Sequence, residues 1–193
     1  MNSNINTALD AGVQLNDYRS DVVEIAALRG RVREIEGIAA TRGISLPGFG
    51  RVVSTGRWLT LSVRPERWWV LQAPTAAGAR AAQWQTACAG IGTAVDFSSA
   101  LVVLHLAGPR ARELLARSSR VDLHETALPT GRAVATLMAQ ASVTIAAIPS
   151  GLLVLTPSTT ARHFREWLLG SAKLCGLLPQ STRGAVEMFG GSA

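Results

Sequence analysis

The 193-residue sequence contains very little lysine and cysteine, and each shortage excludes a class of protein. Lys173 is the only lysine beside eighteen arginines, so the net charge of +6 comes without the clustered lysines and interleaved aromatics of a nucleic-acid-binding surface. Cys88 and Cys175 are the only cysteines and have no CxxC-type neighbour. We therefore expect free buried thiols in a reducing compartment, and no nucleic acid as partner.

Long hydrophobic runs are absent as well. No apolar stretch approaches the roughly 18 residues that a membrane-spanning helix needs, although 48% of the residues are hydrophobic. The first twelve residues have neither the basic start nor the apolar centre of a signal peptide. The sequence therefore predicts a cytoplasmic protein that has no membrane partner.

Motifs of independent catalysis are missing from the chain. It has no glycine-rich dinucleotide fingerprint, no phosphate-binding loop and no HExxH zinc motif. The histidines His105, His124 and His163 fall on different predicted elements, without the spacing of metal ligands. His105 lies in an apolar strand, where a packed side chain with a hydrogen bond is favoured over a ligand. We expect no catalytic, cofactor-binding or metal-binding residue in this chain.

The stretch from Ala94 to Arg117 has the most regular pattern in the sequence. A continuous apolar run at 101–106 is typical of a strand that is buried on both faces. Gly108 and Pro109 end this strand, and Pro109 suits the first turn of the helix that follows. This strand and helix form a folding unit onto which the rest of the chain is built.

Three polar residues, Asp96, Ser98 and Ser99, precede this strand. Their side chains are conceivable parts of a catalytic set, but no histidine is suitably placed in the sequence. Aspartate and serine at the ends of elements routinely hydrogen-bond backbone N–H groups. We favour this structural role, in which they cap the backbone where the strand bends.

The remaining pattern predicts an α+β protein with two helix-on-antiparallel-sheet subdomains. Residues 21–95 show strand, helix, two strands, helix and strand, which is a ferredoxin-like order. In this interpretation Arg51–Val63 is one strand. Residues 96–178 form the second subdomain, and 1–20 and 179–193 are expected as flexible tails.

The densest aromatic patch is Trp68-Trp69, which lies close to Arg64 and Arg67. Adjacent strand residues point to opposite faces, so only one of the two indoles packs into a one-sided core. Tryptophan and arginine are enriched where protein interfaces gain their binding energy. A partner surface formed by these four residues and simple core packing are equally supported by the sequence, which does not say which indole faces outward.

Several short motifs, in this order and spacing, resemble the gamma subunit of heterotetrameric sarcosine oxidase. That family is itself similar to the folate-binding aminomethyltransferase, or glycine-cleavage T-protein, fold. The resemblance covers about residues 22–176 and is carried by Leu28-Arg29-Gly30, Ile44-Ser45-Leu46-Pro47, Arg64-Pro65-Glu66-Arg67-Trp68, Val95-Asp96-Phe97-Ser98-Ser99, Leu106-Ala107-Gly108-Pro109-Arg110-Ala111-Arg112, Val121-Asp122-Leu123-His124 and Phe164-x-x-Trp167-Leu168.

The resemblance implies a non-catalytic subunit of a flavoenzyme that oxidatively demethylates sarcosine. It implies alpha, beta and delta subunits as partners, with FAD, FMN, NAD and tetrahydrofolate on those subunits and none on this chain. The sequence departs from the family pattern at Ala100 and Leu101, where a polar residue and an arginine are usual, and at Glu66-Arg67, where Asp-Glu is usual.

Two alternatives stay open within this fold, and one outside it. The chain is alternatively a gamma-like subunit of an enzyme that demethylates another N-methylated amino acid. It is alternatively a stand-alone folate-binding protein, although it has only about half the length of such proteins. A basic nucleic-acid-binding module is the third alternative, and it predicts steeply salt-dependent binding.

Overall fold

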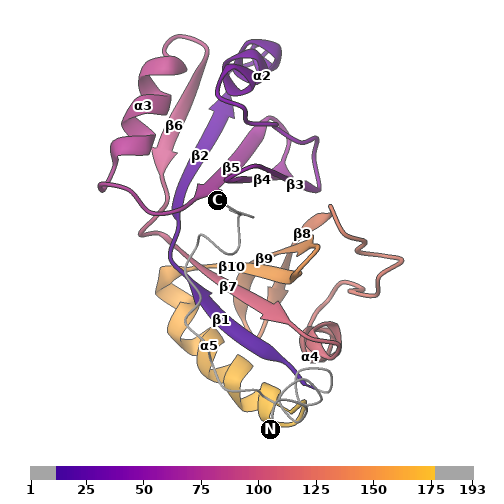
Figure 1. The fold of residues 1–193 in the computed structure, drawn as a ribbon. Coiled ribbons are helices and arrows are strands. Elements are labelled where there is room, and N and C mark those ends of the chain that lie inside the picture. The colour runs from indigo at the N-terminus through magenta and orange to yellow at the C-terminus, as the bar shows by residue number, and fades with distance from the viewer. Residues whose placement is uncertain (1–11, 177–193) are drawn as a thin grey trace, which may run out of the picture. The chain divides into compact units, whose positions relative to one another are not determined.

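The computed structural model describes residues 12–176, and these fall into two compact units. Unit 1 combines residues 12–18 with 102–176, and unit 2 contains residues 19–101. Each unit has one five-stranded sheet with helices on one face, which gives the mixed α+β architecture that the sequence predicts (Figure 1). The expected C-terminal tail at 179–193 lies outside the described residues.

Unit 2 is built around a sheet with the strand order β3-β4-β5-β2-β6, in which all neighbouring pairs are antiparallel. Helices α2 and α3 bury their apolar sides against one face of this sheet. The elements are β2 (Asp21–Ala27), α2 (Val32–Thr41), β3 (Arg51–Thr55), β4 (Trp58–Arg64), β5 (Arg67–Gln72), α3 (Ala79–Ala87) and β6 (Gly92–Asp96).

The single strand expected over Arg51–Val63 is wrong, because this segment folds into a hairpin of β3 and β4. Gly56 lies in the two-residue turn with φ of +55°, a conformation that glycine adopts without steric cost. The sequence suggested one strand because alternation continues through the turn. Three strands therefore separate the two helices of unit 2, instead of the two that the ferredoxin-like order requires.

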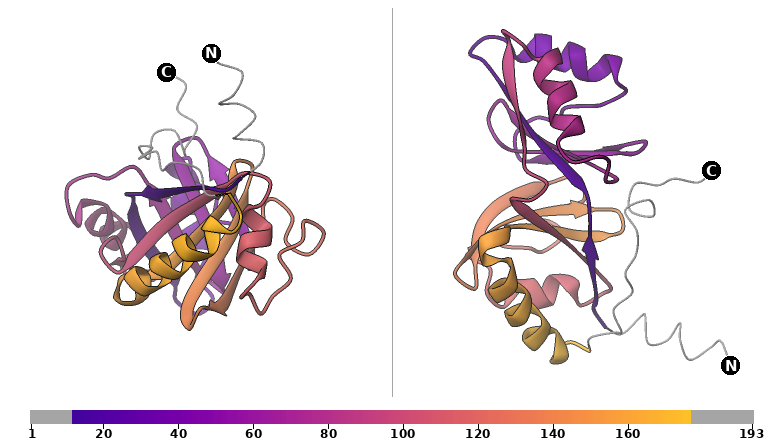
Figure 2. Two further views of the ribbon diagram at one scale, coloured as in Figure 1. Left: turned by 90° about the horizontal axis from the view of Figure 1, so that it is seen from below. Right: turned by 90° about the vertical axis from the view of Figure 1, so that its left-hand side faces the viewer.

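Unit 1 contains a sheet with the order β1-β7-β10-β9-β8. Figure 2 shows α4 and α5 on the same side of this sheet, where both contribute to one apolar core. The elements are β1 (Gln14–Tyr18), β7 (Leu101–Ala107), α4 (Ala111–Ala116), β8 (Ala133–Met138), β9 (Ala141–Ile148), β10 (Gly151–Pro157) and α5 (Ser158–Lys173).

Strand β1 lies in the segment that we expected to be a flexible tail, so this expectation is wrong for residues 14–18. The strand pairs antiparallel with β7, with Leu15 opposite Leu106 and Tyr18 opposite Val103. Leu15 is the only aliphatic side chain of this strand, so hydrophobic periodicity in the sequence does not predict it. Its stability comes from pairing with a strand about ninety positions later, which no local pattern can show.

The last two strands and the last helix of unit 1 follow from apolar patterning. The apolar segments 142–148 and 152–156 predict two short strands. Strands β9 and β10 occupy these segments and are buried along almost their whole length. Phe164 and Leu168 of α5 are fully buried against this sheet. The helical spacing of Ala161, Phe164, Leu168 and Ala172 in the sequence predicts this packed face, and the structure confirms it.

Candidate functional site: an acidic, aromatic and basic cluster on unit 2

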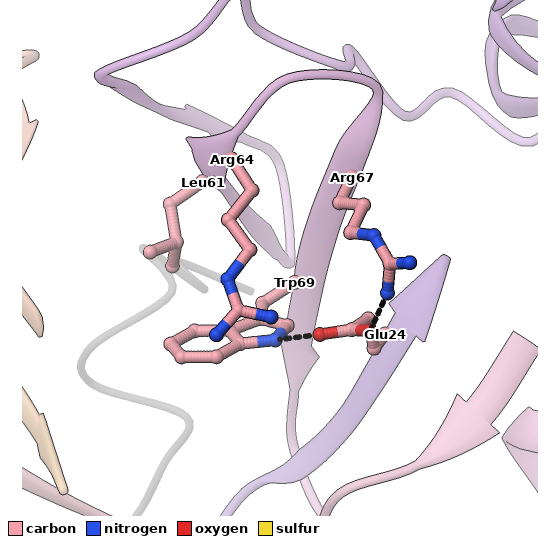
Figure 3. A pocket seen from close by; sticks show the side chains of 5 residues that line it. All are labelled: Glu24, Leu61, Arg64, Arg67 and Trp69. Atoms are coloured by element: carbon pink, nitrogen blue, oxygen red, sulfur yellow. Dashed lines mark hydrogen bonds and ion pairs between the residues drawn. The ribbon is translucent and has the colours of Figure 1, made fainter. Parts of the chain in front are cut away.

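Five side chains line a small pocket of unit 2 (Figure 3). Those of Glu24, Leu61 and Trp69 lie on the face of the sheet opposite α2 and α3, because their neighbours along the strands pack under the helices. The strand register places them there, because Glu24 of β2 and Leu61 of β4 both pair with Trp69 of β5. Arg64 and Arg67 pair across the β4–β5 turn. We call Glu24, Leu61, Arg64, Arg67 and Trp69 the Glu24 cluster.

Trp68 does not belong to this cluster, although it is next to Trp69 in the sequence. It pairs with Ile25 and is only 4% exposed, within the apolar core under the helices. Its indole Nε1 donates a 2.8 Å hydrogen bond to the Pro47 carbonyl oxygen. Trp68 is therefore a core residue, and the period of the strand separates it from its neighbour.

Trp69 is half-buried and takes part in a hydrogen-bonded set centred on Glu24. Its Nε1 donates to Glu24 Oε2 at 2.9 Å, and Arg67 Nη1 donates to Glu24 Oε1 at 3.0 Å (Figure 3). The Glu24 side chain is 12% exposed, whereas that of Arg67 is 49% exposed. The carboxylate thus neutralises one arginine and fixes the orientation of the indole.

The space between these five side chains has a volume of about 10 Å³. A volume of this size accommodates about one water molecule, and no organic ligand. The cluster instead offers the half-buried indole of Trp69 and the exposed guanidinium of Arg64, whereas Leu61 is only 1% exposed. Such a surface suits contact with a protein, because aromatic and arginine side chains are enriched at interfaces.

Asp96 and Ser98 accept hydrogen bonds from backbone N–H groups, which is the structural role expected for them. Ser98 N donates to Asp96 Oδ1 at 2.9 Å, and Val22 N donates to Ser98 Oγ at 3.0 Å. Hydrogen bonds from the Ser98 hydroxyl and then from the Ser98 amide lower the pKa of Asp96, with a smaller contribution from the Gly78 amide and with burial opposing them. Ser99 is exposed. The motif therefore holds the beginning of β2 next to the end of β6.

Gly108 ends β7 in a conformation that requires glycine. Its φ is +99°, and a Cβ atom at this position would lie 2.3 Å from the Gly12 carbonyl oxygen. Pro109 lies outside helix α4, whose N-cap is Arg110, so its expected place in the first turn is wrong by two positions. Gly108 and Pro109 form the corner that leads into α4, with no group free for chemistry.

His105 is a packed residue, as expected for a histidine in an apolar strand. It is 5% exposed, and its Nε2 lies 3.0 Å from the Ser150 carbonyl oxygen and 3.2 Å from Ser150 Oγ. The Tyr18 hydroxyl lies 3.4 Å from its Nδ1. Residues 12–176 contain no group of three or more side chains placed to hold a metal ion.

Unit 2 has a second pocket, which the sequence did not predict. It lies on the helix side of the sheet, has a volume of about 200 Å³, and is lined by Arg42, Arg57, Trp58, Arg80, Gln83 and Trp84. These residues come from the end of α2, the β3–β4 turn and α3, so only the packing of three elements brings them together.

A model of the sarcosine oxidase gamma subunit family matches residues 36–172, which is more than half of the chain. The chain belongs to this family. The match includes β3 to β6 of unit 2 and nearly all of unit 1, so it spans both units. No curated protein sequence matches the chain.

Two solved structures show where else this fold occurs. A chain of the heterotetrameric sarcosine oxidase from Corynebacterium sp. U-96 superposes with a TM-score of 0.75 at 22% identity, over 93% of this chain and 94% of that one. The glycine cleavage system aminomethyltransferase T from Bartonella henselae superposes with a TM-score of 0.63 at 16% identity, over 89% of this chain. The gamma-family chain covers 48% of that aminomethyltransferase.

Within residues 12–176, no helix combines the length and the apolar character that crossing a bilayer demands. Cys88 and Cys175 are both buried and free. Burial raises the pKa of the Cys88 thiol, and the nearby positive charge of Arg42 opposes this shift. Cys88 is therefore a packing residue and not an activated nucleophile.

Proposed function

We propose that this chain is the non-catalytic gamma-type subunit of a heterotetrameric sarcosine oxidase, which oxidatively demethylates sarcosine in a tetrahydrofolate-linked reaction. The match of the family model over residues 36–172 carries this proposal. The similarity of fold to a sarcosine oxidase chain along 94% of that chain's length supports it. The role of the subunit is to support assembly with the large subunit.

The proposal assigns the chemistry to the partner chains. FAD, FMN, NAD and tetrahydrofolate are bound by the alpha, beta and delta subunits, and this chain supplies packing surface. The Glu24 cluster is our candidate for part of that surface, because it presents an indole and an arginine around a space too small for a ligand. A cytoplasmic location agrees with two buried thiols that form no disulfide.

The experiment that tests this function is affinity purification of the tagged full-length chain from its native host, followed by mass spectrometry and an absorbance spectrum. We expect a yellow eluate that contains three partner chains. Its colour should bleach when sarcosine is added. Bleaching by another N-methylated amino acid instead would reassign the substrate and keep the gamma role. A colourless, solitary chain that binds a reduced folate saturably would replace the proposal with a stand-alone folate-binding protein.

The same purification tests the Glu24 cluster as an interface. Arg64→Glu reverses an exposed charge of the cluster, and we expect about tenfold less partner protein in the eluate. Arg33→Glu is the matched control, because Arg33 is also exposed but lies on α2, on the other side of the sheet. Equal recovery of partners with Arg64→Glu and with the unchanged protein would remove the cluster from the interface.

A further inference from the structure

The helix-side hollow of unit 2 collects positive charge without a matching acid. We call Arg42, Arg57, Trp58, Arg80, Gln83 and Trp84 the arginine hollow. Within residues 12–176, no carboxylate forms an ion pair with Arg42, Arg57 or Arg80. On the same helix as Arg42, by contrast, Glu34 pairs with Arg31 at 2.6 Å. The hollow is therefore a place where like charges lie close together and an anion would lower their repulsion.

Two buried tryptophans hold these arginines in place. Arg42 lies over the Trp84 ring, with its Cζ 5.0 Å from the ring centroid. Arg57 and Arg80 both lie over the Trp58 ring, at 5.4 and 5.6 Å. Stacking on a ring occupies the face of a guanidinium group and leaves its in-plane N–H donors available for an oxyanion. One of these donors, Arg42 Nη1, already donates to the Ile38 carbonyl oxygen at 3.1 Å. The arginines are thus oriented before any ligand arrives.

Several hydrogen-bond donors in the hollow remain available. Arg80 Nε is buried, and it has no hydrogen-bond partner in the described part of the chain. Arg80 Nη1 donates to Gln83 Oε1 at 3.4 Å, a long contact that leaves the amide nitrogen of Gln83 as a further donor. A buried donor without a partner is costly, and a ligand oxygen would remove that cost.

We propose that the arginine hollow binds the phosphate group of a small phosphorylated molecule. Three guanidinium groups and an amide match the several oxygens and the double charge of a phosphate. The volume of about 200 Å³ is twenty times that of the Glu24 cluster and admits a small organic ligand. An acidic protein segment fits less well, because Trp58 and Trp84 are only 8% and 3% exposed and offer a partner almost no apolar area.

This site is separate from the proposed role in assembly, and its test does not require the partner subunits. The full-length chain is titrated with inorganic pyrophosphate, and in a second run with inorganic phosphate, by calorimetry and tryptophan fluorescence at low salt. We expect saturable binding with one site per chain. We also expect a change in emission, because an anion that engages the guanidinium groups shifts them over the Trp58 and Trp84 rings.

Two variants and one control locate the binding. Arg57→Gln and Arg80→Gln each remove a charged donor and are expected to weaken pyrophosphate binding at least tenfold. Arg33→Gln makes the same change of net charge near the start of α2, about 13 Å along the helix from Arg42, and is expected to leave binding unchanged. Arg57 lies in the β3–β4 turn, so its variant serves if Arg80→Gln disturbs α3.

Four outcomes would overturn the assignment. The first is an absence of saturable binding of either anion at low salt. The second is pyrophosphate binding that Arg57→Gln and Arg80→Gln leave unchanged. The third is equal weakening by Arg33→Gln, which would show unspecific attraction to the positive charge of the chain. The fourth is tighter binding of a glutamate-rich peptide than of pyrophosphate, which would make an acidic protein segment the occupant.

Discussion

The Glu24 cluster and the arginine hollow lie on opposite faces of the same sheet and use the same two residue types, arginine and tryptophan. The Glu24 cluster contains one acidic residue, and the lining of the arginine hollow contains none. Glu24 accepts hydrogen bonds from both Arg67 and Trp69, so the charge of Arg67 is neutralised, and the space in the cluster is about 10 Å³. The arginine hollow has no such acid among the described residues and stays open to about 200 Å³.

This contrast shows that a cluster of arginine and tryptophan can serve different kinds of binding, depending on whether an acid lies beside it. Where a carboxylate is placed between them, they form a surface that has no room for an organic ligand and suits protein contact. Where the tryptophans are buried and the arginines stack on them without an acid, the donors remain free for an anion. Substitutions on the two faces of the sheet separate these two roles.

The largest effect is expected from the two neighbouring tryptophans, which lie on opposite faces. Trp68→Ala removes a 4% exposed ring from the core and leaves the Pro47 carbonyl without its partner, so it should lower the free energy of unfolding by about 3–5 kcal/mol. Trp69→Ala removes a half-buried ring and should cost roughly 1–2 kcal/mol. Urea unfolding curves measure both. Equal losses would show that the two indoles are not on different faces.

An intermediate effect is expected when the acid is removed from the Glu24 cluster. Glu24→Gln keeps an acceptor for Trp69 Nε1 but loses the charge that faces Arg67, whose side chain is 49% exposed. Solvent screens this pair, so the free energy of unfolding should fall by about 0.5–1 kcal/mol. Pyrophosphate should still bind at one site per chain, because the cluster has no room for it. A second site in the calorimetric titration would show that charge alone, without space, makes a phosphate site.

The smallest effect on stability is expected at Glu113 of unit 1, whose carboxylate lies between two arginines and whose side chain is 47% exposed. Hydrogen bonds from Arg110 at 2.8 Å and from Arg117 at 2.9 Å lower its pKa from 4.5 to about 2. Since the pKa is lower in the folded state, the stabilisation is present above pH 4.5 and is lost as the pH falls toward 2. An NMR titration of the Glu113 side chain measures the pKa directly.

The control for this titration is Arg110→Gln together with Arg117→Gln. These substitutions remove both donors, so the pKa of Glu113 should return toward 4.5. A midpoint near 4.5 in the unchanged protein would contradict the ion pairs on α4. It would also argue against the ion pair between Glu24 and Arg67, which is the same kind of contact in a less exposed setting.

Most elements could be predicted from the sequence because their signals are local. The apolar run of β7, the helical spacing of Phe164 and Leu168, and the backbone-capping role of Asp96 and Ser98 all agree with the structure. Two local predictions were wrong for a common reason. The β3–β4 turn and strand β1 depend on pairing partners, and neither interrupts nor creates a strong apolar pattern.

The candidate sites were predicted only in part. Arg64, Arg67 and Trp69 were identified because they are close together in the sequence, and period-two alternation correctly required that Trp68 and Trp69 point to opposite faces. Glu24 was missed, because it lies more than forty positions earlier and reaches Trp69 through the β2–β5 register. The arginine hollow was missed entirely, because its members come from three elements.

The sequence by itself determined the fold class, the position of most helices and strands, and the resemblance to the gamma subunit family. These follow from periodicity and short motifs, which act over a few residues. Only the tertiary structure decided which indole is exposed, which arginine has an acid beside it and which face carries a cavity. Those properties depend on distances between residues far apart in the chain, and the strand register and helix packing set these distances.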